Sequence, residues 1–212
     1  MGIQQWYDAH ILPGFIKKAC SQGQIMKRRS QVIPLASGAV FELGCGGGIN
    51  QEMYDTSAVT SYAGIDPHPG LLNDTREQAA ARLGSPIDIR EGVGENIPFR
   101  SGSFDTVVCT YTLCSVEDPQ QVMSEMRRIL KPGGRLLFLE HGRAPDVGVL
   151  KWQERIEPVW KRIGGGCHLT RPIGSALRGA GFEVEPIGQG YIPKTPRFAG
   201  WNEWGIARKA GA

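Results

Sequence analysis

A glycine-rich segment follows an apolar run near the start of the chain. The apolar residues 39–43 (AVFEL) are followed by residues 44–48 (GCGGG), which hold four glycines in five positions. Because a turn needs only one or two glycines, this number at a strand-to-helix junction favours a nucleotide-like ligand close to the backbone. A dinucleotide fingerprint would have glycine in place of Ile49. The spacing instead suits a ligand whose amino-acid portion lies against the turn.

A carboxylate lies at the end of the next expected strand. The segment GIDP (64–67) places Asp66 eighteen residues beyond Gly48. A carboxylate at a strand tip can accept hydrogen bonds from both hydroxyls of a ribose. An aspartate before a proline is also common in turns and helix caps, but the combined spacing favours ribose binding.

Strands and helices that alternate along the chain must position these residues. Runs with strand character are residues 39–43, 60–66, 86–91, 103–110, 134–140, 182–188 and 203–208. Helical spacing relates Leu71, Leu72, Ala79 and Leu83 after Pro69, and Val122, Met126, Ile129 and Leu130 before KPGG. This alternation predicts an α/β fold with a parallel sheet covered on both faces. Such sheets bind ligands beyond the carboxyl ends of their strands.

Composition and charge exclude several classes of protein. A chain of 212 residues with 41% hydrophobic content suits one domain and has no apolar run that approaches the about 18 residues of a membrane span. The N-terminus lacks the pattern of a secretory signal, so we expect a cytoplasmic protein. Five cysteines without a CxxC pair predict reduced thiols and no metal site. The net charge of +3 is too small to indicate a nucleic-acid partner.

Two amphipathic segments lie outside the alternating core. Residues 1–37 predict an N-terminal helical arm, separate from a domain over 38–212. Its apolar residues are Trp6, Tyr7, Ile11, Phe15 and Ile16, and its basic residues are Lys17, Lys18, Lys27, Arg28 and Arg29. A lid, a helix packed on the sheet and a membrane-surface anchor are all compatible with this pattern. Residues 147–166 predict a helical insertion after strand five, interrupted at Pro158.

Four motifs together resemble the class I S-adenosylmethionine-dependent methyltransferases, in the methyltransferase-type-11 group. They are ELGCGGG, GIDP, GENIPFRSGSFDTVV and LKPGGRLLFLEH, and they span about residues 38–142. VCTYTLCSV (108–116) and GGGCHLTR (164–171) are further similar to methyltransferase-like alkyl thiol methyltransferases and their bacterial relatives. The resemblance implies a Rossmann-like doubly wound sheet of seven strands whose last strand, NEWGIARK, is antiparallel. It also implies S-adenosylmethionine as the cofactor, whose methionyl end the glycines would admit.

The resemblance assigns cofactor contacts to particular residues. They are Glu42, Gly44, Cys45, Gly46, Gly48, Asp66, Pro67, Gly94, Glu95, Asn96, Thr110 and Leu113. Asp66 would hold the ribose, and Thr110 would face the amino-acid portion. Relatives often have an aspartate for the adenine amino group where this chain has Val93. Gly94, Glu95 or Asn96 would have to replace it, and a solvated loop is the alternative interpretation of Glu95 and Asn96.

The acceptor side is expected after strands four and five. Methyl transfer requires alignment of the acceptor, exclusion of water and a route for the acceptor's proton. His141, directly after strand five, is the candidate base, although a hydrogen-bonded loop histidine is an equally open interpretation. Tyr111, Cys114, Trp152, Trp160 and His168 are the expected acceptor contacts.

A small apolar molecule is the expected acceptor, with a thiol as the first hypothesis. Lipid amine N-methylation and quinone-type O- or C-methylation are the alternatives among enzymes, and a cofactor-binding regulatory domain is the alternative without catalysis. The thiol-methylating relatives have an N-terminal apolar anchor that this chain lacks, so we expect at most peripheral membrane contact. No NPPY-like tetrapeptide follows strand four, which argues against methylation of nucleic acids or side-chain amides.

Overall fold

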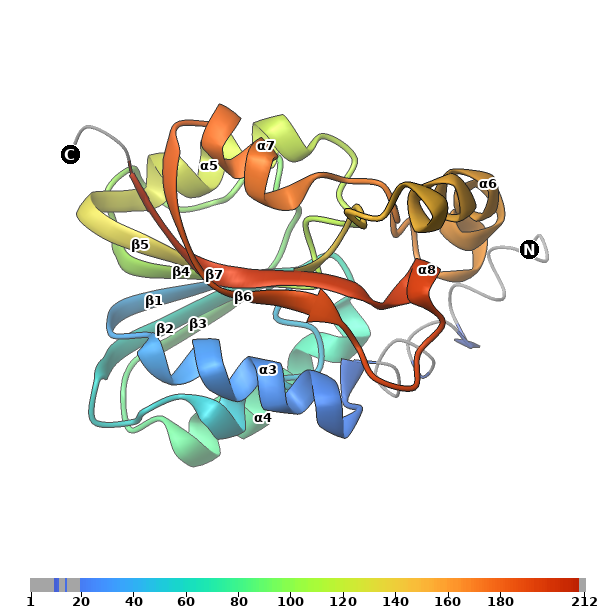
Figure 1. The fold of residues 1–212 in the computed structure, drawn as a ribbon. Helices are drawn as coiled ribbons and strands as arrows, with labels where there is room; N and C mark the ends of the chain where they lie inside the picture. The colour runs from blue at the N-terminus through green and yellow to red at the C-terminus, as the bar shows by residue number, and fades with distance from the viewer. Residues whose placement is uncertain (1–9, 12–13, 15–19, 210–212) are drawn as a thin grey trace.

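A seven-stranded sheet forms the centre of the molecule, in the order β3-β2-β1-β4-β5-β7-β6 (Figure 1). The computed structural model describes residues 10, 11, 14 and 20–209. The strands are β1 (Gly38–Leu43), β2 (Val59–Asp66), β3 (Ile87–Glu91), β4 (Phe104–Thr110), β5 (Leu130–His141), β6 (Phe182–Tyr191) and β7 (Trp201–Lys209). Strands β1 to β5 are parallel, whereas β7 is antiparallel to both of its neighbours. The predicted doubly wound sheet with an antiparallel last strand is therefore confirmed.

Helices cover both faces of the sheet (Figure 1). α3 (Gly23–Val32) and α4 (Pro69–Arg82) lie on one face, and α5 (Pro119–Ile129) and α7 (Ile173–Gly179) lie on the other. α6 (Val147–Ile163) and the short α8 (Arg197–Gly200) lie beyond the carboxyl end of β5. Two 3₁₀ turns, η1 (Ile33–Leu35) and η2 (Gln51–Met53), flank β1 in the chain. Among the described residues, no helix is long and apolar enough to cross a bilayer.

Alternation along the central strands divides the core into two layers. Phe41, Val107 and Phe138 belong to the layer under α5 and α7. Their neighbours Val40 and Leu137 belong to the layer that contacts α3 and α4. Successive side chains of a strand point to opposite faces, so strands that are apolar on both faces must be covered on both. The apolar runs in the sequence are continuous because both faces of these strands are buried.

Two expectations about the helices differ from the structure. Leu130 was expected in the helix, but α5 ends at Ile129 and Leu130 begins β5, where it pairs with Phe104. The helix after strand five was expected to break at Pro158, but α6 continues through it. Pro158 is exposed. The carbonyl that loses its intrahelical partner there can bond to water, which lowers the cost of a proline within the helix.

The strand order reverses between β1 and β4. β1 pairs with β2 on one side and with β4 on the other, so the connections that leave these two strands run to opposite faces of the sheet. The loops after β1 and β4 therefore separate and leave a crevice beyond the strand ends. This is the place where the predicted site residues gather.

Candidate functional site

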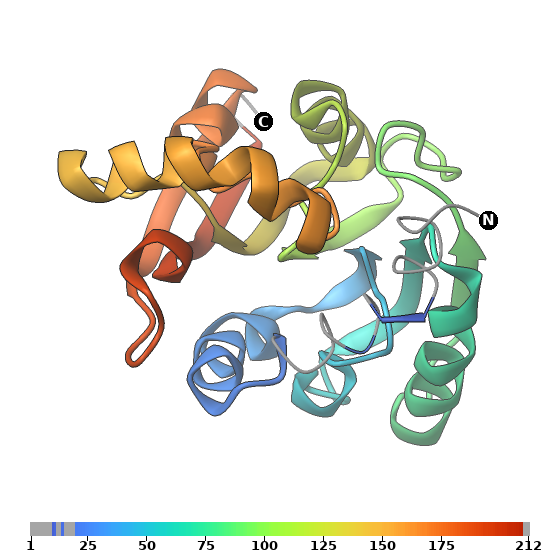
Figure 2. The same cartoon turned by 90° about the vertical axis from the view of Figure 1, so that its right-hand side faces the viewer.

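A cavity of about 540 Å³ opens at the carboxyl ends of the strands, the end of the sheet that faces the viewer in Figure 2. Of the predicted cofactor residues it is lined by Glu42, Gly44, Cys45, Gly46, Asp66, Pro67, Gly94, Glu95 and Thr110. Gly48, Asn96 and Leu113 do not line it. Its other walls include Cys20, Arg29, Asn50, Tyr111, Thr112, Ser115 and Gly165. The volume lies within the range of small-molecule sites, roughly 300–1,000 Å³.

The glycines of the loop after β1 are required for different structural reasons. Gly44 has φ +70°, and a Cβ there would collide with the Thr112 side chain. Gly48 has φ +75°, and its Cβ would lie 3.0 Å from Gln78 of α4. At Gly46 the nearest atom to an added Cβ is Asp66 Oδ2 at 3.8 Å. Gly44 and Gly48 thus allow the loop to pack against protein, and Gly46 leaves space towards the cavity.

Asp66 ends β2 and is only 7% exposed. Its Oδ2 accepts a hydrogen bond of 2.9 Å from the Gly46 N–H, and its Oδ1 accepts one of 2.9 Å from the His68 N–H. Burial raises the pKa of Asp66, against the effect of these two donors. Carboxylate oxygens have further lone pairs, so the group remains able to accept bonds from a ligand.

The segment after β3 forms another wall of the cavity. Val93 and Gly94 line the cavity. Glu95 Oε1 accepts hydrogen bonds from the Glu117 N–H (2.9 Å) and the Asp118 N–H (3.2 Å), which joins this segment to the start of α5. Asn96 is exposed and does not line the cavity. An adenine contact through backbone groups at Gly94 or Glu95 stays a prediction.

Arg29 of α3 reaches the cavity from the N-terminal part of the chain and was missed from the sequence. Its guanidinium donates to Asn50 Oδ1 at 2.6 Å and to Thr110 Oγ1 at 2.7 Å, and it lies over the Tyr111 ring. Its Nε has no hydrogen-bond partner among the described residues although it is buried. Arg29 therefore lines the cavity with a positive charge, and its Nε–H is an unused donor.

The basic segment around Arg29 is not a surface cluster as a whole. Arg29 is 3% exposed, and Arg28 is 9% exposed with bonds to Asn202 Oδ1 (2.6 Å) and the Tyr191 carbonyl (2.8 Å). Of the three alternatives for this segment, these contacts favour a helix packed on the sheet, because Arg28 and Arg29 join α3 to the sheet and to β7. Lys17 and Lys18, together with Trp6, Tyr7, Phe15 and Ile16, lie outside the described residues. The boundary at residue 37 stays a prediction.

Glu42 is the buried centre of the hydrogen-bond network that includes Asn50 and Arg29. Its carboxylate accepts hydrogen bonds from Asn50 Nδ2 (2.8 Å), Tyr54 Oη (2.8 Å) and Tyr62 Oη (2.7 Å). Burial raises the pKa of Glu42, while these donors and the Arg29 charge oppose that rise. Asn50 also donates to Thr110 Oγ1 at 3.1 Å. Glu42 thus orients Asn50, and through it the groups on the cavity wall.

The loop after β4 lines another part of the cavity and is held by Glu140. The carboxylate accepts hydrogen bonds from the backbone N–H groups of Thr112 (2.9 Å), Leu113 (3.1 Å) and Cys114 (3.3 Å). Tyr111 begins this loop with φ 54° and donates to Asn202 Oδ1 at 2.7 Å. Leu113 points into the core. Tyr111 lines the cavity, as expected for an acceptor contact.

The remaining predicted acceptor residues lie behind or away from the cavity wall. His141 is 6% exposed, and its Nδ1 lies 3.4 Å from Cys167 Sγ. His168 Nδ1 lies 3.1 Å from Glu157 Oε1, which ties its loop to α6. Cys114 is buried, and its carbonyl accepts a hydrogen bond of 2.7 Å from the His168 N–H. None of these three side chains lines the cavity, so their roles stay predictions.

The two tryptophans of α6 differ in their surroundings. Trp160 packs against Phe198 of α8 with ring centroids 6.0 Å apart. Trp152 is 58% exposed and lies on the outer side of the helix. Neither lines the cavity. A role for Trp152 in contacting the acceptor would require movement of α6.

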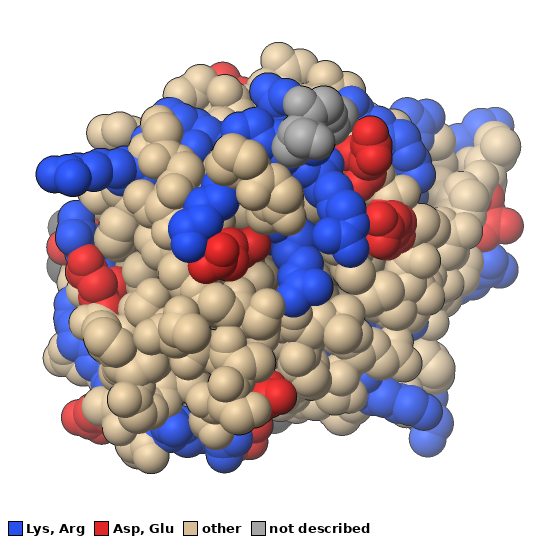
Figure 3. All heavy atoms as spheres, turned by 90° about the vertical axis from the view of Figure 1, so that its left-hand side faces the viewer, with Lys and Arg blue, Asp and Glu red and all other residues tan. Residues whose placement is uncertain are grey.

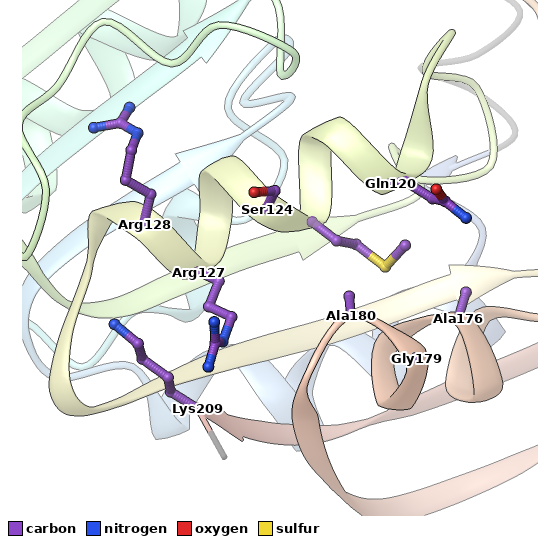
Figure 4. Close-up of a pocket in the computed structure, with 9 residues that line it drawn as sticks. Gln120, Ser124, Arg127, Arg128, Ala176, Gly179, Ala180 and Lys209 are labelled. Atoms are coloured by element: carbon purple, nitrogen blue, oxygen red, sulfur yellow. The ribbon is translucent and has the colours of Figure 1, made fainter. Parts of the chain in front are cut away.

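A second hollow of about 480 Å³ lies between α5 and α7, away from the strand ends (Figure 4). It is lined by Gln120, Met123, Ser124, Arg127, Arg128, Ala176, Gly179, Ala180 and Lys209. No predicted site residue belongs to it. The face at the amino ends of the parallel strands shows Lys and Arg next to Asp and Glu (Figure 3). In the part of the chain that the structure describes, no group of three His, Cys, Asp or Glu could hold a metal ion.

Burial of Glu140 makes the stability of the protein depend on pH. Burial outweighs the three N–H donors and raises the pKa of Glu140 to about 7, above its ordinary value of 4.5. The native state then keeps a proton that the unfolded chain releases above about pH 4.5. The stabilising contribution is therefore complete below about pH 4.5 and is lost as the pH rises through about 7. The two pKa values correspond to about 3 kcal/mol at most.

We expect the free energy of unfolding in urea to fall less between pH 5 and pH 8 in Glu140→Gln than in the wild type. Glu154→Gln, an exposed substitution on α6, should keep the wild-type dependence. Equal pH dependence in wild type and Glu140→Gln would show that Glu140 is ionised throughout this range.

Comparison with known proteins relates this fold and cavity to one family. A family model described as a methyltransferase domain matches residues 41–138. The thiol S-methyltransferase TMT1B of Homo sapiens is 38% identical over 170 residues, which cover 76% of this chain and 69% of that protein. A ubiquinone biosynthesis O-methyltransferase of Pseudomonas paraeruginosa is 32% identical over 180 residues, which cover 77% of this chain and 73% of that protein.

Solved structures agree with this relationship. A SAM-dependent methyltransferase from Methanosarcina mazei superposes with a TM-score of 0.65 and 21% identity, covering 83% of this chain and 94% of that one. The predicted enzyme class and cofactor are confirmed by these relatives. The chain belongs to the S-adenosylmethionine-dependent methyltransferases, and S-adenosylmethionine is its cofactor.

Proposed function

We propose that this protein transfers a methyl group from S-adenosylmethionine to the sulfur of a small apolar thiol. The observation that carries the choice of a thiol is the 38% identity to the human thiol S-methyltransferase over 76% of this chain. The similarity to a ubiquinone biosynthesis O-methyltransferase, at 32% identity, keeps O-methylation as the second candidate. Lipid amines are a third candidate.

The two ends of the cavity offer complementary partners for the cofactor. S-adenosylmethionine supplies an activated methyl group, so the chain's residues need only bind, orient and exclude water. Asp66 offers carboxylate oxygens for ribose hydroxyls, and Gly46 leaves space beside it. At the other end Arg29 offers a positive charge and an unused Nε–H for the carboxylate of the methionyl portion. The donors and acceptors of the cavity therefore fit this cofactor.

The acceptor side is suited to an apolar molecule that must lose a proton. Cys20, Tyr111, Ser115 and Val116 line this side of the cavity. His141 Nε2 is buried and has no hydrogen-bond partner among the described residues, so it is available to receive a proton. His141 does not line the cavity, so a proton from the acceptor would reach it through a bound water.

A panel of acceptors tests the reaction type. Apolar thiols, phenols and amines of equal size should be compared for cofactor-dependent turnover, with S-adenosylhomocysteine as the measured product. We expect the highest kcat/KM with thiols. A preference for phenols or amines would reject S-methylation while leaving the enzyme class intact.

Removal of the Asp66 carboxylate should weaken cofactor binding. Charge-assisted hydrogen bonds are worth about 1.5–3 kcal/mol each and are not additive, so we expect Asp66→Ala to reduce the affinity for S-adenosylhomocysteine at least about tenfold. Isothermal calorimetry measures this change. Asp88→Ala, which removes an exposed carboxylate of β3, is the matched control and should bind normally. Unchanged affinity in a folded Asp66→Ala protein would reject the ribose assignment.

Arg29 should discriminate between ligands with and without the amino-acid portion. Arg29→Met should weaken binding of S-adenosylhomocysteine about tenfold or more and leave the affinity for adenosine close to that of the wild type. Arg29→Lys, which keeps the charge, should lose less. Equal losses for both ligands would mean that Arg29 shapes the cavity without binding the carboxylate.

His141 should affect the pH dependence of thiol turnover. A free thiol has a pKa near about 8.5 and reacts as the thiolate, so without a base the rate should rise as the pH approaches that value. We therefore expect His141→Gln to lose turnover below about pH 8 and to recover part of it at higher pH, with unchanged affinity for S-adenosylhomocysteine. Wild-type activity across the pH range in this variant would remove His141 from the mechanism.

We further propose a cytoplasmic protein that contacts anionic lipid surfaces peripherally through α6. All five cysteines are free, as is usual in a reducing compartment. Trp152, Val159 and Ile163 follow one another on one side of α6 and are 58%, 60% and 44% exposed. The exposed Lys151 and Arg155 lie beside this stripe, and Arg155 stacks on Trp152. Apolar residues flanked by cations are typical of helices that lie in a lipid interface.

Sedimentation with vesicles tests this contact. We expect binding to vesicles that contain phosphatidylserine, weaker binding in high salt, and loss of most binding in Trp152→Ser. Ile187→Ser, at another exposed apolar position on β6, is the control and should bind like the wild type. Absence of binding to anionic vesicles at low salt would reject the proposal.

A further inference from the structure

Two cysteines for which methyl transfer has no evident use meet behind the acceptor side of the cavity. Cys114 comes from the loop after β4, and Cys167 comes from the loop after α6. Cys167 Sγ lies 3.4 Å from His141 Nδ1, and the Cys114 carbonyl accepts a hydrogen bond of 2.7 Å from the N–H of His168, the residue after Cys167. Cys114 Sγ also lies 3.5 Å from Ser115 Oγ. The cluster therefore brings together two thiols and an imidazole from distant parts of the chain.

The backbone already holds the two cysteines side by side. The N–H of His168, the residue after Cys167, donates to the Cys114 carbonyl at 2.7 Å. Glu140 fixes the Cys114 N–H from the other side. A disulfide needs two Cα atoms about 4.4–6.8 Å apart, which is a separation that neighbouring hydrogen-bonded segments provide. Gly165 and Gly166 precede Cys167 with φ 62° and 79°, so this loop is able to adjust locally.

The two thiols have opposite chemical character. The Cys114 thiol and the His141 imidazole lower the pKa of Cys167 well below its ordinary value, against the effect of burial. The contact with Cys167 and burial raise the pKa of Cys114. The other titratable groups that face this pair are Cys20, Glu140 and Arg171. A thiolate beside a protonated thiol is the arrangement in which one sulfur attacks an oxidant and the other resolves the product.

We propose that Cys167 and Cys114 form a peroxide-sensitive dithiol that closes to a reversible disulfide. The Cys167 thiolate attacks one oxygen of hydrogen peroxide, an S–O bond forms, the O–O bond breaks, and hydroxide leaves. Cys114 sulfur then attacks the sulfenic sulfur, an S–S bond forms and the S–O bond breaks. The departing hydroxide takes the Cys114 proton and leaves as water. Two electrons pass from the pair of sulfur atoms to the peroxide.

The disulfide would constrain the acceptor side and not the cofactor side. Ser115 and Gly165 line the cavity and belong to the two loops that the disulfide would link. Asp66 and Arg29 belong to β2 and α3, outside these loops. Oxidation should therefore reduce acceptor turnover while the affinity for S-adenosylhomocysteine stays within about twofold. This activity effect rests on the proposed function, whereas the disulfide itself does not.

Peptide mass spectrometry of the full chain after brief exposure to hydrogen peroxide tests the pairing. We expect a Cys114–Cys167 linked peptide that dithiothreitol releases. In Cys114→Ser, Cys167 should accumulate as a sulfenic acid that dimedone traps, and in Cys167→Ser, Cys114 should remain a thiol. Cys109→Ala removes a different buried cysteine and should leave the disulfide unchanged. A Cys20–Cys167 link would overturn the proposal. So would a Cys167 thiol that remains unmodified at a peroxide concentration that oxidises glutathione.

A second measurement separates the dithiol from the methyl-transfer mechanism. Iodoacetamide reacts with thiolates, so Cys167 should be alkylated faster than Cys109 at pH 6.5, and His141→Gln should slow the reaction at Cys167. Neither result depends on an acceptor. Absence of thiol turnover together with a formed disulfide would reject the proposed function alone. Slow alkylation of Cys167, equal to that of Cys109, would reject the dithiol alone.

Discussion

The buried carboxylate of Glu42 is the constraint on which the cavity depends. A charge removed from water must be compensated by hydrogen bonds or by an opposite charge. Here the donors come from the loop after β1, from the turn at Tyr54 and from β2 through Tyr62. Asn50 passes the same network to Thr110 and Arg29. Satisfying one carboxylate therefore fixes the relative positions of β1, β2, β4 and α3, which are the elements around the cofactor side.

Arg29 contributes the positive charge of this network. Its charge lowers the cost of burying Glu42, and its bonds to Asn50 and Thr110 use only part of its donor capacity. Its buried Nε has no hydrogen-bond partner among the described residues, and Arg29 lines the cavity, so an anionic ligand group would complete the hydrogen bonding. An N-terminal helix that is separate from the core in sequence is thus part of the cavity. Of the alternatives that the sequence leaves open for this segment, a helix packed on the sheet accounts for that contact.

Local patterns in the sequence were sufficient for the sheet and for the residues that line the cavity at the ends of β1 and β2. Alternating apolar runs, the glycines after β1 and the carboxylate at the end of β2 each report on their own position in a strand or turn. Arg29 could not be found in this way, because a run of three basic residues gives no sign of which cation is buried. Trp152 shows the reverse case. Its helical stripe resembles a core pattern, yet the face is exposed because no other described element packs over it.

The division of the cavity explains why the acceptor is harder to infer than the cofactor. The cofactor side consists of strand ends whose positions follow from the hydrogen bonds of the sheet. The proposed acceptor side consists of two loops, after β4 and after α6. Glu140 holds the loop after β4, and the hydrogen bond from the His168 N–H to the Cys114 carbonyl joins the two loops. Loop side chains can change without disturbing the sheet, so similar cofactor motifs are compatible with different acceptors. We therefore expect the residues that select the acceptor to lie in these two loops, and not in the glycine motif.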